Sequence, residues 1–246
     1  MKQVLAGQPA IPAYYQRMRP TNQQGPVVLG RLPEPRPMDP DEIKGAMAKG
    51  ALLIDAREPS AFGGAHVPGA YSIGLGPSFT TWVGSVVPDG QPLLLVVEKA
   101  EELTDAVLQL LRIGYEDIRG YLAGGIDAWL AAGEQVLHVP QLSVFELNDA
   151  LGRNGSATHV LDVRSGTEWQ QGHIARAAHI PGGDLPARMG ELTVSQPISV
   201  ICGSGYRSSV ACSILQRHGF EQVANVIGGM TAWQQAGLPT THNGTR

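Results

Sequence analysis

The sequence predicts an α/β fold of two tandem domains, each a parallel sheet with helices on both faces. The first observation is length, because 246 residues give each half enough chain for a core of its own. The second is the alternation of short apolar runs with helical patterns, which is typical of βαβ units. The third is an internal repeat, in which several separate motifs recur in the same order.

The composition is that of an ordinary globular protein. Hydrophobic residues make up 43% of the chain, and the formal net charge is −4 with no long basic run, which argues against nucleic acid or an acidic membrane as a partner. Two cysteines cannot build a disulfide framework, and no apolar stretch approaches the length of a transmembrane helix. The first residues lack the apolar core of a signal peptide, so we expect a reducing, cytoplasmic location.

Residues 1–36 are expected to form an N-terminal segment outside the two domains. The segment is rich in Pro, Gly, Gln and Arg, and prolines at this density break regular elements. Its aromatic and apolar residues indicate that it packs on something rather than floating free. These residues are Ile11, Tyr14, Tyr15, Val27, Val28 and Leu29.

The first domain is predicted over residues 37–137. Asp39 is suited to cap a helix that opens with Pro40. The apolar run Leu93–Val97 predicts a buried strand, and a helix is expected from about Glu101 to Arg112. The following residues 138–141 are interpreted as a short linker, stiffened by proline.

The second domain is predicted over residues 141–240, because the motifs of the first domain recur there. Ser143 can cap a helix from Val144 to Gly152, as Asp39 does in the first copy. The matched residues are Asp55 with Asp162, His66 with His173, Gly114 with Gly219, Gly124–Gly125 with Gly228–Gly229, and Trp129 with Trp233. The distance from Asp to His is eleven positions in both copies, which supports two copies of one fold.

The stretch Cys202–Ser208 is the candidate functional site. The apolar run Pro197–Ile201 predicts a buried strand that ends at the cysteine, and Ser209–His218 has helical spacing. The two glycines between them permit backbone geometry closed to other residues, so the loop can aim several N–H groups at one point beside a helix N-terminus. A cysteine sulfur there is favoured as the nucleophilic thiolate, and Arg207 supplies a cation for a bound anion.

At these residues the chain resembles the rhodanese family of sulfurtransferases. The resemblance rests on Cys202, followed five positions later by Arg207 and then by Ser208, in a loop between strand and helix. It implies an enzyme in which Cys202 takes sulfane sulfur from thiosulfate or a low-molecular-weight persulfide and passes it to a thiol or sulfite acceptor. Cys202 and Arg207 would be catalytic, and no metal or organic cofactor is implied. The substrate-binding residues would be Gly203, Ser204, Gly205, Tyr206 and Ser208.

Residues 1–36 also resemble the connector that follows the metal-binding domain in fusions of a metallo-β-lactamase-fold persulfide dioxygenase with rhodanese domains. The clustered His-x-His-x-Asp-His ligands of that dioxygenase do not occur in this sequence. The resemblance therefore implies a persulfide dioxygenase domain or partner outside this sequence.

The first copy has lost the reactive loop. Pro92 to Val97 spans the same distance as Pro197 to Cys202, so Val97 stands in the place of the cysteine. Glu102 replaces Arg207, and a carboxylate and an alanine replace the two glycines, so we expect a non-catalytic first domain. The Asp–Arg pairs (Asp55 with Arg57, Asp162 with Arg164) and the two matched histidines occur in both copies, and we interpret them as scaffold.

Two other residues of the second copy have structural interpretations. Cys212 lies in the middle of the helical pattern with no glycine or cation beside it, and we expect a buried, inert thiol. Glu168 occurs only in the second copy, where the first has Ala61. Packing is the favoured explanation for that difference.

Two alternative functions remain open. Cysteine phosphatases and arsenate reductases share the fold, but the related phosphatases have a loop one residue longer between Cys and Arg, so the shorter spacing here favours sulfur chemistry. The second alternative is a non-enzymatic binding module in which both domains act as scaffold. The intact loop around Cys202 argues against it.

Overall fold

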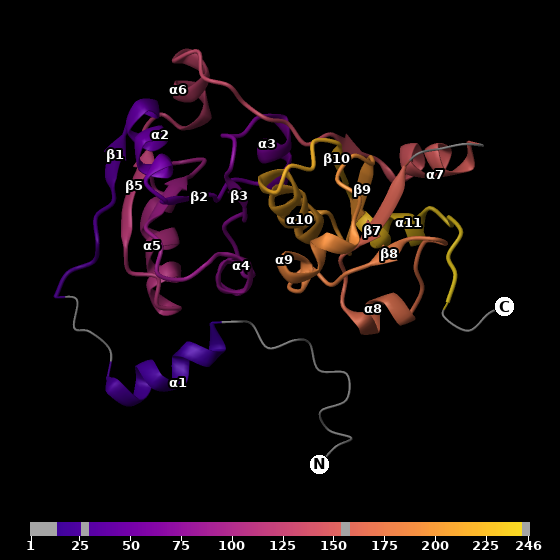
Figure 1. The fold of residues 1–246 in the computed structure, drawn as a ribbon, viewed down its shortest axis with the longest axis horizontal. Coiled ribbons are helices and arrows are strands. Elements are labelled where there is room, and N and C mark those ends of the chain that lie inside the picture. The colour runs from indigo at the N-terminus through magenta and orange to yellow at the C-terminus, as the bar shows by residue number, and fades with distance from the viewer. Residues whose placement is uncertain (1–13, 26–29, 154–157, 243–246) are drawn as a thin grey trace. The chain divides into compact units, whose positions relative to one another are not determined.

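The computed structural model describes residues 14–25, 30–153 and 158–242. The chain divides into two compact units between His138 and Val139. We call them the N-terminal unit and the C-terminal unit, and each contains one five-stranded parallel sheet (Figure 1). The fold class predicted from the sequence is confirmed.

The N-terminal unit has the strand order β1-β5-β4-β2-β3, so its chain crosses from the edge to the middle of the sheet through helices. Its elements are β1 (Arg36–Met38), α2 (Pro40–Ala48), β2 (Leu52–Asp55), α3 (Pro59–Gly64), β3 (Tyr71–Ser72), α4 (Phe79–Val86), β4 (Leu93–Val96), α5 (Glu102–Arg112), β5 (Ile118–Leu122) and α6 (Gly125–Ala131).

The C-terminal unit repeats this topology, with the strand order β6-β10-β9-β7-β8. Its elements are β6 (Gln141–Leu142), α7 (Val144–Gly152), β7 (His159–Asp162), α8 (Gly166–Gln170), β8 (Ala178–His179), α9 (Leu185–Arg188), a 3₁₀ turn (Met189–Glu191), β9 (Ile198–Ile201), α10 (Tyr206–Arg217), β10 (Val223–Val226) and α11 (Gly229–Gln235). Two units with one strand order confirm that the sequence repeat is a repeat of the fold.

The helix starts predicted from the sequence are confirmed at both entry helices. Asp39 caps α2 and Ser143 caps α7, and each forms a capping box with a glutamate three residues later, Glu42 and Glu146. Each cap satisfies N–H groups that the first helical turn leaves without partners. The two units therefore enter their first helix by the same hydrogen-bond pattern.

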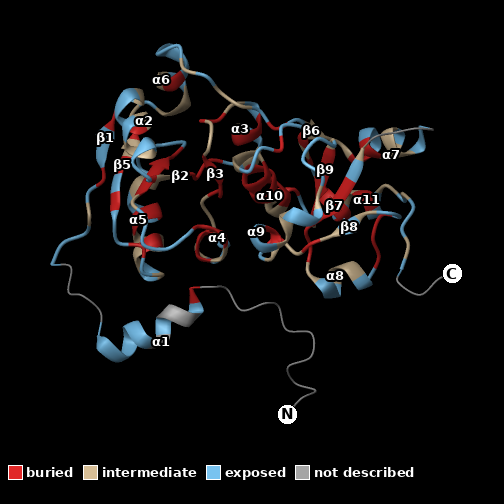
Figure 2. Ribbon diagram, viewed as in Figure 1, coloured by how far each residue is buried: buried red, intermediate tan, exposed pale blue. Residues whose placement is uncertain are grey.

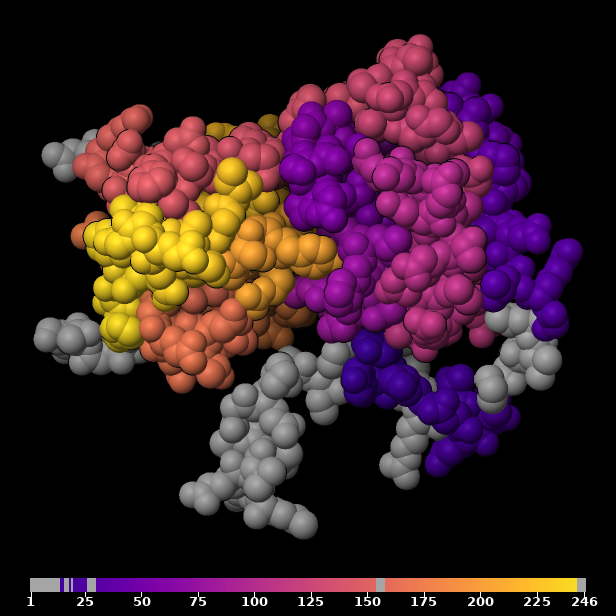
Figure 3. All heavy atoms as spheres, turned by 180° about the vertical axis from the view of Figure 1, so that it is seen from behind, coloured from indigo at the N-terminus to yellow at the C-terminus, as the bar shows by residue number. Residues whose placement is uncertain are grey.

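The cores lie along the central strands, where both faces are covered. Every residue of β4 and of β9 is buried, as expected for strands inside a parallel sheet (Figure 2). In the C-terminal unit, α7 and α11 pack against each other (salmon and yellow in Figure 3), and Leu147 and Trp233 belong to the core that they share. Within the described ranges, no helix has both the length and the apolar character needed to cross a membrane.

The N-terminal segment corrects one expectation, because helix α1 (Tyr15–Gln24) forms with Pro20 inside it. A proline removes one backbone donor, and the loss of that single bond does not end this helix. At its N-terminal end Tyr14 is buried against α4, where a Cβ on Gly84 would lie 2.2 Å from the tyrosine ring. Packing of the segment is thus confirmed for Tyr14, whereas Tyr15 is exposed. Ile11, Val27, Val28 and Leu29 lie outside the described residues.

Candidate active site

The Cys202 loop joins β9 to α10, as the sequence predicts. Strand β9 ends at Ile201, and α10 begins at Tyr206, three residues earlier than the expected Ser209. Arg207 and Ser208 therefore lie in the first turn of the helix. Gly205 has a φ of +110°, a backbone conformation that other residues rarely adopt, so this position favours glycine.

The N-terminus of α11 holds the loop from behind. The carbonyl oxygens of Cys202 and Gly203 accept hydrogen bonds from the N–H groups of Met230 (2.7 Å) and Thr231 (3.0 Å). In a trans peptide the carbonyl and the following N–H point in opposite directions. Turning these carbonyls toward α11 therefore directs the next N–H groups of the loop away from α11.

One backbone N–H of the loop, that of Gly205, faces the sulfur of Cys202. The Gly205 N–H donates to Cys202 Sγ at 3.1 Å, and Ser208 Oγ lies 3.3 Å from the same sulfur. Cys202 is fully buried, at 0% exposure. A sulfur that receives a backbone N–H at the start of a helix is placed where negative charge is stabilised.

Arg207 lies beside this sulfur and is held by a carboxylate. Its Nη1 and Nη2 atoms each bond one oxygen of Glu168, both at 2.7 Å. The hydrogen bonds from Arg207 lower the pKa of Glu168 to about 2, with help from Ser165. The pKa of Arg207 is raised, first by Glu168 and then by the charge of Cys202. The guanidinium therefore remains charged and fixed in direction.

Glu168 is a site residue that the sequence analysis assigned to packing. Its side chain closes the capping box of α8 through Ser165 and reaches the loop through Arg207. The sequence carried one signal of this role, because Glu168 is present only in the copy that has the cysteine.

The predicted substrate-binding residues contribute in different ways. Gly205 gives its N–H to the sulfur, and Ser208 brings a hydroxyl. Gly203 leaves room for the guanidinium, since a Cβ there would lie 2.7 Å from Arg207 Nη2. Ser204 is exposed, and Tyr206 opens α10.

A family model described as "Rhodanese-like domain" matches residues 39–132 and 143–236, which together exceed half of the chain. The chain belongs to the rhodanese family. The model matches both domains, so the domain without the cysteine belongs to the family as well.

Three curated proteins are similar to parts of this rhodanese chain. A putative sulfur carrier protein of Bacillus subtilis, YrkF, is 33% identical over 102 residues, which are 42% of this chain and 55% of that protein. A sulfurtransferase of Allochromatium vinosum is 38% identical over 80 residues, 32% of this chain and 75% of that protein. The thiosulfate sulfurtransferase GlpE of Vibrio cholerae is 35% identical over 81 residues, 33% of this chain and 76% of that protein. The match thus spans about half the length of the first relative and about three quarters of the other two.

In the first rhodanese domain, the side chain of Glu102 bonds the backbone of the loop that corresponds to the Cys202 loop. Val97 follows β4, as Cys202 follows β9. The Glu102 carboxylate, in the place of Arg207, accepts the N–H groups of Glu98 (3.2 Å) and Lys99 (3.3 Å). In a reactive loop such backbone N–H groups would face a bound anion, whereas here they donate to a carboxylate of the same loop. This arrangement agrees with a first domain that has no reactive thiol.

The residues shared by both rhodanese domains are structural, as predicted. Arg164 bonds Asp162 at 2.6 Å and the carbonyl of Gly172 at 2.8 Å, and all three groups are buried. Arg57 makes the matching bonds to Asp55 and Ala65 in the first domain. His66 and His173 are buried and bond backbone carbonyls through Nδ1, which confirms their interpretation as scaffold.

Cys212 is the second free thiol, and it lies in a helix instead of in the loop between β9 and α10. It lies in the middle of α10 with no exposed surface. Burial raises the pKa of the Cys212 thiol, and the nearby charge of Cys202 raises it further. A thiol that stays protonated is a poor nucleophile, in agreement with the sequence prediction.

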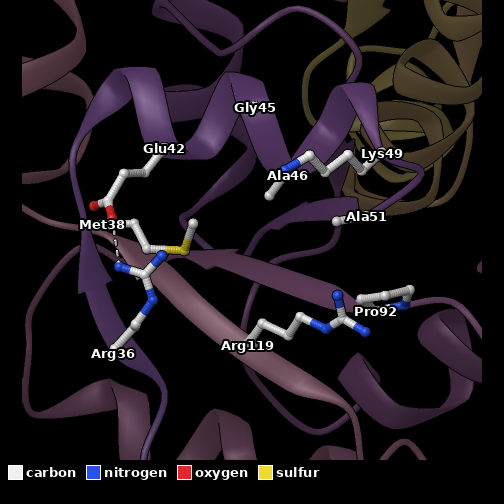
Figure 4. A pocket seen from close by; sticks show the side chains of 9 residues that line it. All are labelled: Arg36, Met38, Glu42, Gly45, Ala46, Lys49, Ala51, Pro92 and Arg119. Atoms are coloured by element: carbon white, nitrogen blue, oxygen red, sulfur yellow. Dashed lines mark hydrogen bonds and ion pairs between the residues drawn. The ribbon is translucent and has the colours of Figure 1, made fainter.

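The N-terminal unit also contains a cavity of about 360 Å³ that contains none of the loop residues (Figure 4). The guanidinium groups of Arg36 and Arg119 approach it from the neighbouring strands β1 and β5. Arg36 is paired with Glu42 at 2.6 Å, and Arg119 is paired with Asp117 at 2.9 Å. These cations are already neutralised by partners in the same unit.

Proposed function

We propose that the C-terminal rhodanese domain is a sulfurtransferase that carries sulfane sulfur on Cys202 as a persulfide. One observation carries the proposal: a buried cysteine sulfur receives a loop N–H at 3.1 Å next to a fixed guanidinium. The sulfurtransferase names of two relatives support it. Cys202 and Arg207 are the proposed catalytic residues.

In the first proposed half-reaction, the Cys202 thiolate attacks the outer sulfur of the donor. A sulfur–sulfur bond forms at Cys202 while that of the donor breaks, and the leaving group departs as sulfite from thiosulfate or as a thiol from a persulfide. The bonding electrons leave with the departing group, so no external oxidant is needed. The loop N–H groups and Arg207 stabilise the negative charge on sulfur.

In the second half-reaction, a thiol or sulfite acceptor attacks the outer sulfur of the Cys202 persulfide. The Cys202 thiolate is then the leaving group, and the loop returns to its starting state. Positioning and electrostatic stabilisation account for this chemistry without a metal or organic cofactor. The proposed donors are thiosulfate and low-molecular-weight persulfides.

We further propose a persulfide dioxygenase as a functional partner, either a separate protein or a joined domain, in a reducing compartment. Its support is the resemblance of residues 1–36 to the connector of such fusions. Sulfite release from glutathione persulfide by a purified dioxygenase should change when this protein is added, and a Cys202→Ser protein should give no such change. Equal effects of both proteins would remove this part of the proposal.

The test of the sulfurtransferase proposal is mass spectrometry of the protein after exposure to thiosulfate or glutathione persulfide. One added sulfur atom is expected on the Cys202 peptide. Cys202→Ser should abolish both this adduct and turnover, whereas Cys212→Ser should retain them. Sulfur on Cys212 alone, or equal loss of turnover in both variants, would contradict the assignment.

A further inference from the structure

A chain of polar side chains runs from the sulfur of Cys202 through the C-terminal unit to β6. Ser208 Oγ lies 3.3 Å from Cys202 Sγ and 2.5 Å from Asn225 Oδ1. Asn225 Nδ2 donates to Gln141 Oε1 at 2.9 Å, and Gln141 Nε2 donates to the carbonyl of Val139 at 2.8 Å. Ser208 and Asn225 are buried, so water does not compete for these bonds. We call these three side chains, Ser208, Asn225 and Gln141, the relay.

The backbone fixes the direction of every hydrogen bond in the relay. A carbonyl only accepts, so the amide nitrogen of Gln141 must face Val139 and its oxygen must face Asn225. The amide nitrogen of Asn225 then faces Gln141, which leaves its oxygen toward Ser208. Ser208 has a single hydroxyl proton, and the short contact to Asn225 takes it. Toward Cys202, the hydroxyl presents its lone pairs.

We propose that Asn225 and Gln141 are positioning residues that hold the hydroxyl proton of Ser208 away from the sulfur of Cys202. In the resting protein Ser208 accepts a hydrogen bond from the thiol, and its proton stays on Asn225 when the thiolate forms. A thiolate with one donor fewer is less stabilised and more nucleophilic. This inference deepens the proposed function and rests on it.

The N-terminal unit supplies an internal comparison through its sheet register. Asn225 pairs with Val200 of β9 and Gln141 of β6, and Tyr121 pairs with Leu95 of β4 and Pro37 of β1 in the same way. The counterparts of Cys202, Ser208, Asn225 and Gln141 are Val97, Leu103, Tyr121 and Pro37. Leu103 and Pro37 have no hydrogen-bonding side chain, so these counterparts cannot form the relay. The relay is therefore absent where the nucleophile is absent, although the buried Asp–Arg pair and the scaffold histidine are kept in both units.

Charged and titratable groups near the sulfur are unchanged by substitution of the relay. They are Arg207 and Cys212 on α10, Glu168 on α8, and the Asp162–Arg164 pair at the end of β7. Asn225 and Gln141 are neutral, so replacing them alters the hydrogen bonding of Ser208 and leaves every charge in place. A change in the acidity of Cys202 can then be attributed to the relay.

The experiment measures the pH midpoint of Cys202 alkylation by iodoacetamide in the full-length protein, followed by mass spectrometry of the Cys202 peptide. Asn225→Leu removes the acceptor for the Ser208 proton, and Gln141→Leu lets the Asn225 amide turn its nitrogen toward Ser208. Both variants should free the proton for the sulfur and lower the midpoint, with roughly three- to tenfold more thiolate at a fixed pH below it. Gln141 lies at the partly exposed end of the relay and decides the question if Asn225→Leu does not fold.

Two further variants separate positioning from general damage. Ser208→Ala should cancel the effect, so Ser208→Ala with Asn225→Leu should alkylate like Ser208→Ala alone. Ser213→Ala removes another buried hydroxyl of α10, bonded to the Val210 carbonyl at 2.7 Å, and should change the melting temperature without moving the midpoint. An unchanged midpoint in folded Gln141→Leu, or a shift that persists without Ser208, overturns the inference. Alkylation needs no sulfur donor, so this result is distinct from failure of the sulfurtransferase proposal.

Discussion

At the scale of single residues, Arg207 serves two partners at once. Its two-pronged bond with Glu168 fixes the direction of the guanidinium, and its charge faces the sulfur of Cys202. Arg can do this because five donors lie in one rigid plane, which a lysine ammonium cannot reproduce. Glu168 is thus a positioning residue for a cation that the proposed donor anion would meet.

Arg207→Ala should raise the apparent KM for thiosulfate and lower kcat, because the donor loses a cation and the charge on sulfur loses a stabilising partner. Arg207→Lys keeps the charge without the two-pronged bond. Its KM and kcat should lie between those of Arg207→Ala and those of the unmodified protein. Steady-state kinetics with thiosulfate and cyanide measure both parameters. A kcat/KM equal to that of the unmodified protein in Arg207→Ala would show that the side chain does not act on the donor.

Glu168 also predicts a pH dependence of stability. Its pKa in the folded protein is about 2, below the ordinary value of 4.5, so its contribution is present above about pH 4.5 and disappears as the pH falls toward 2. Glu168→Gln should therefore lower the melting temperature at neutral pH. The free energy of unfolding should fall by less than about 1 kcal/mol, because solvent screens this partly exposed pair. The difference between the two proteins should vanish near pH 2.

Glu146→Gln is the matched control for this measurement. Glu146 closes the capping box of α7 with Ser143, as Glu168 does in α8 with Ser165, and it has no bond to an arginine among the contacts described. Both variants lose a capping carboxylate, and only Glu168→Gln should also reduce sulfur transfer. Equal losses of turnover in Glu168→Gln and Glu146→Gln would show that the Glu168–Arg207 pair does not contribute to sulfur transfer.

At the scale of elements, the contact between the Cys202 loop and the N-terminus of α11 decides where the loop N–H groups point. Gly229 allows this contact, because a Cβ there would lie 2.4 Å from the Cys202 carbonyl oxygen. At the matched Gly125 of the first domain there is more space, because a Cβ there would lie 3.9 Å from the Val97 carbonyl oxygen. Both glycines have a positive φ, +53° and +59°, so they differ mainly in the closeness of the loop.

Gly229→Ala and Gly125→Ala therefore form a matched pair. Each alanine pays the strain of a left-handed backbone, about 1–2 kcal/mol. Gly229→Ala must also push the loop away, so it should be the more destabilising variant and should abolish sulfur transfer. Gly125→Ala should keep normal turnover per folded molecule. Thermal unfolding and turnover of both variants decide the point, and active Gly229→Ala would refute the role of α11.

Local patterns of the sequence predicted the elements around the site. The apolar run before Cys202, the two glycines and the helical spacing after them are adjacent in the chain, and the structure has the strand, loop and helix there. Asn225 and Gln141 were not predicted, because the register of β6 and β10 brings them together and the packing of α10 brings Ser208 to Asn225. Glu168 was misjudged for the same reason, since its bond to Arg207 joins residues 39 positions apart. Helix α1 was not predicted because propensity alone disfavours proline inside a helix.

At the scale of the whole molecule, one topology occurs twice and only one copy carries a cysteine at the loop. Both sheets have the same strand order and the same capped entry helix. The differences concentrate at the loop and the relay, where the first domain has Val97, Glu102, Tyr121 and Pro37. The fold is therefore maintained by residues distinct from those proposed for sulfur transfer.

Restoring the cysteine alone should not restore chemistry in the first domain. In Val97→Cys combined with Cys202→Ser, the loop N–H groups of Glu98 and Lys99 would still bond the Glu102 carboxylate. A thiolate beside that carboxylate is disfavoured by like charge. Thiosulfate turnover should stay at the level of Cys202→Ser, while Val97→Cys alone should match the unmodified protein. Substantial transfer by the double variant would overturn the interpretation of the first domain as silent.

The carboxylate of Glu102 has a wider consequence, because it acts as a built-in substitute for a bound anion. A loop that satisfies its own backbone donors does not depend on a passing metabolite for its shape. A domain whose loop donors are satisfied in this way can remain folded without binding a substrate anion. Reactivity then needs to be preserved in only one of the two domains, and the other needs only to keep its fold.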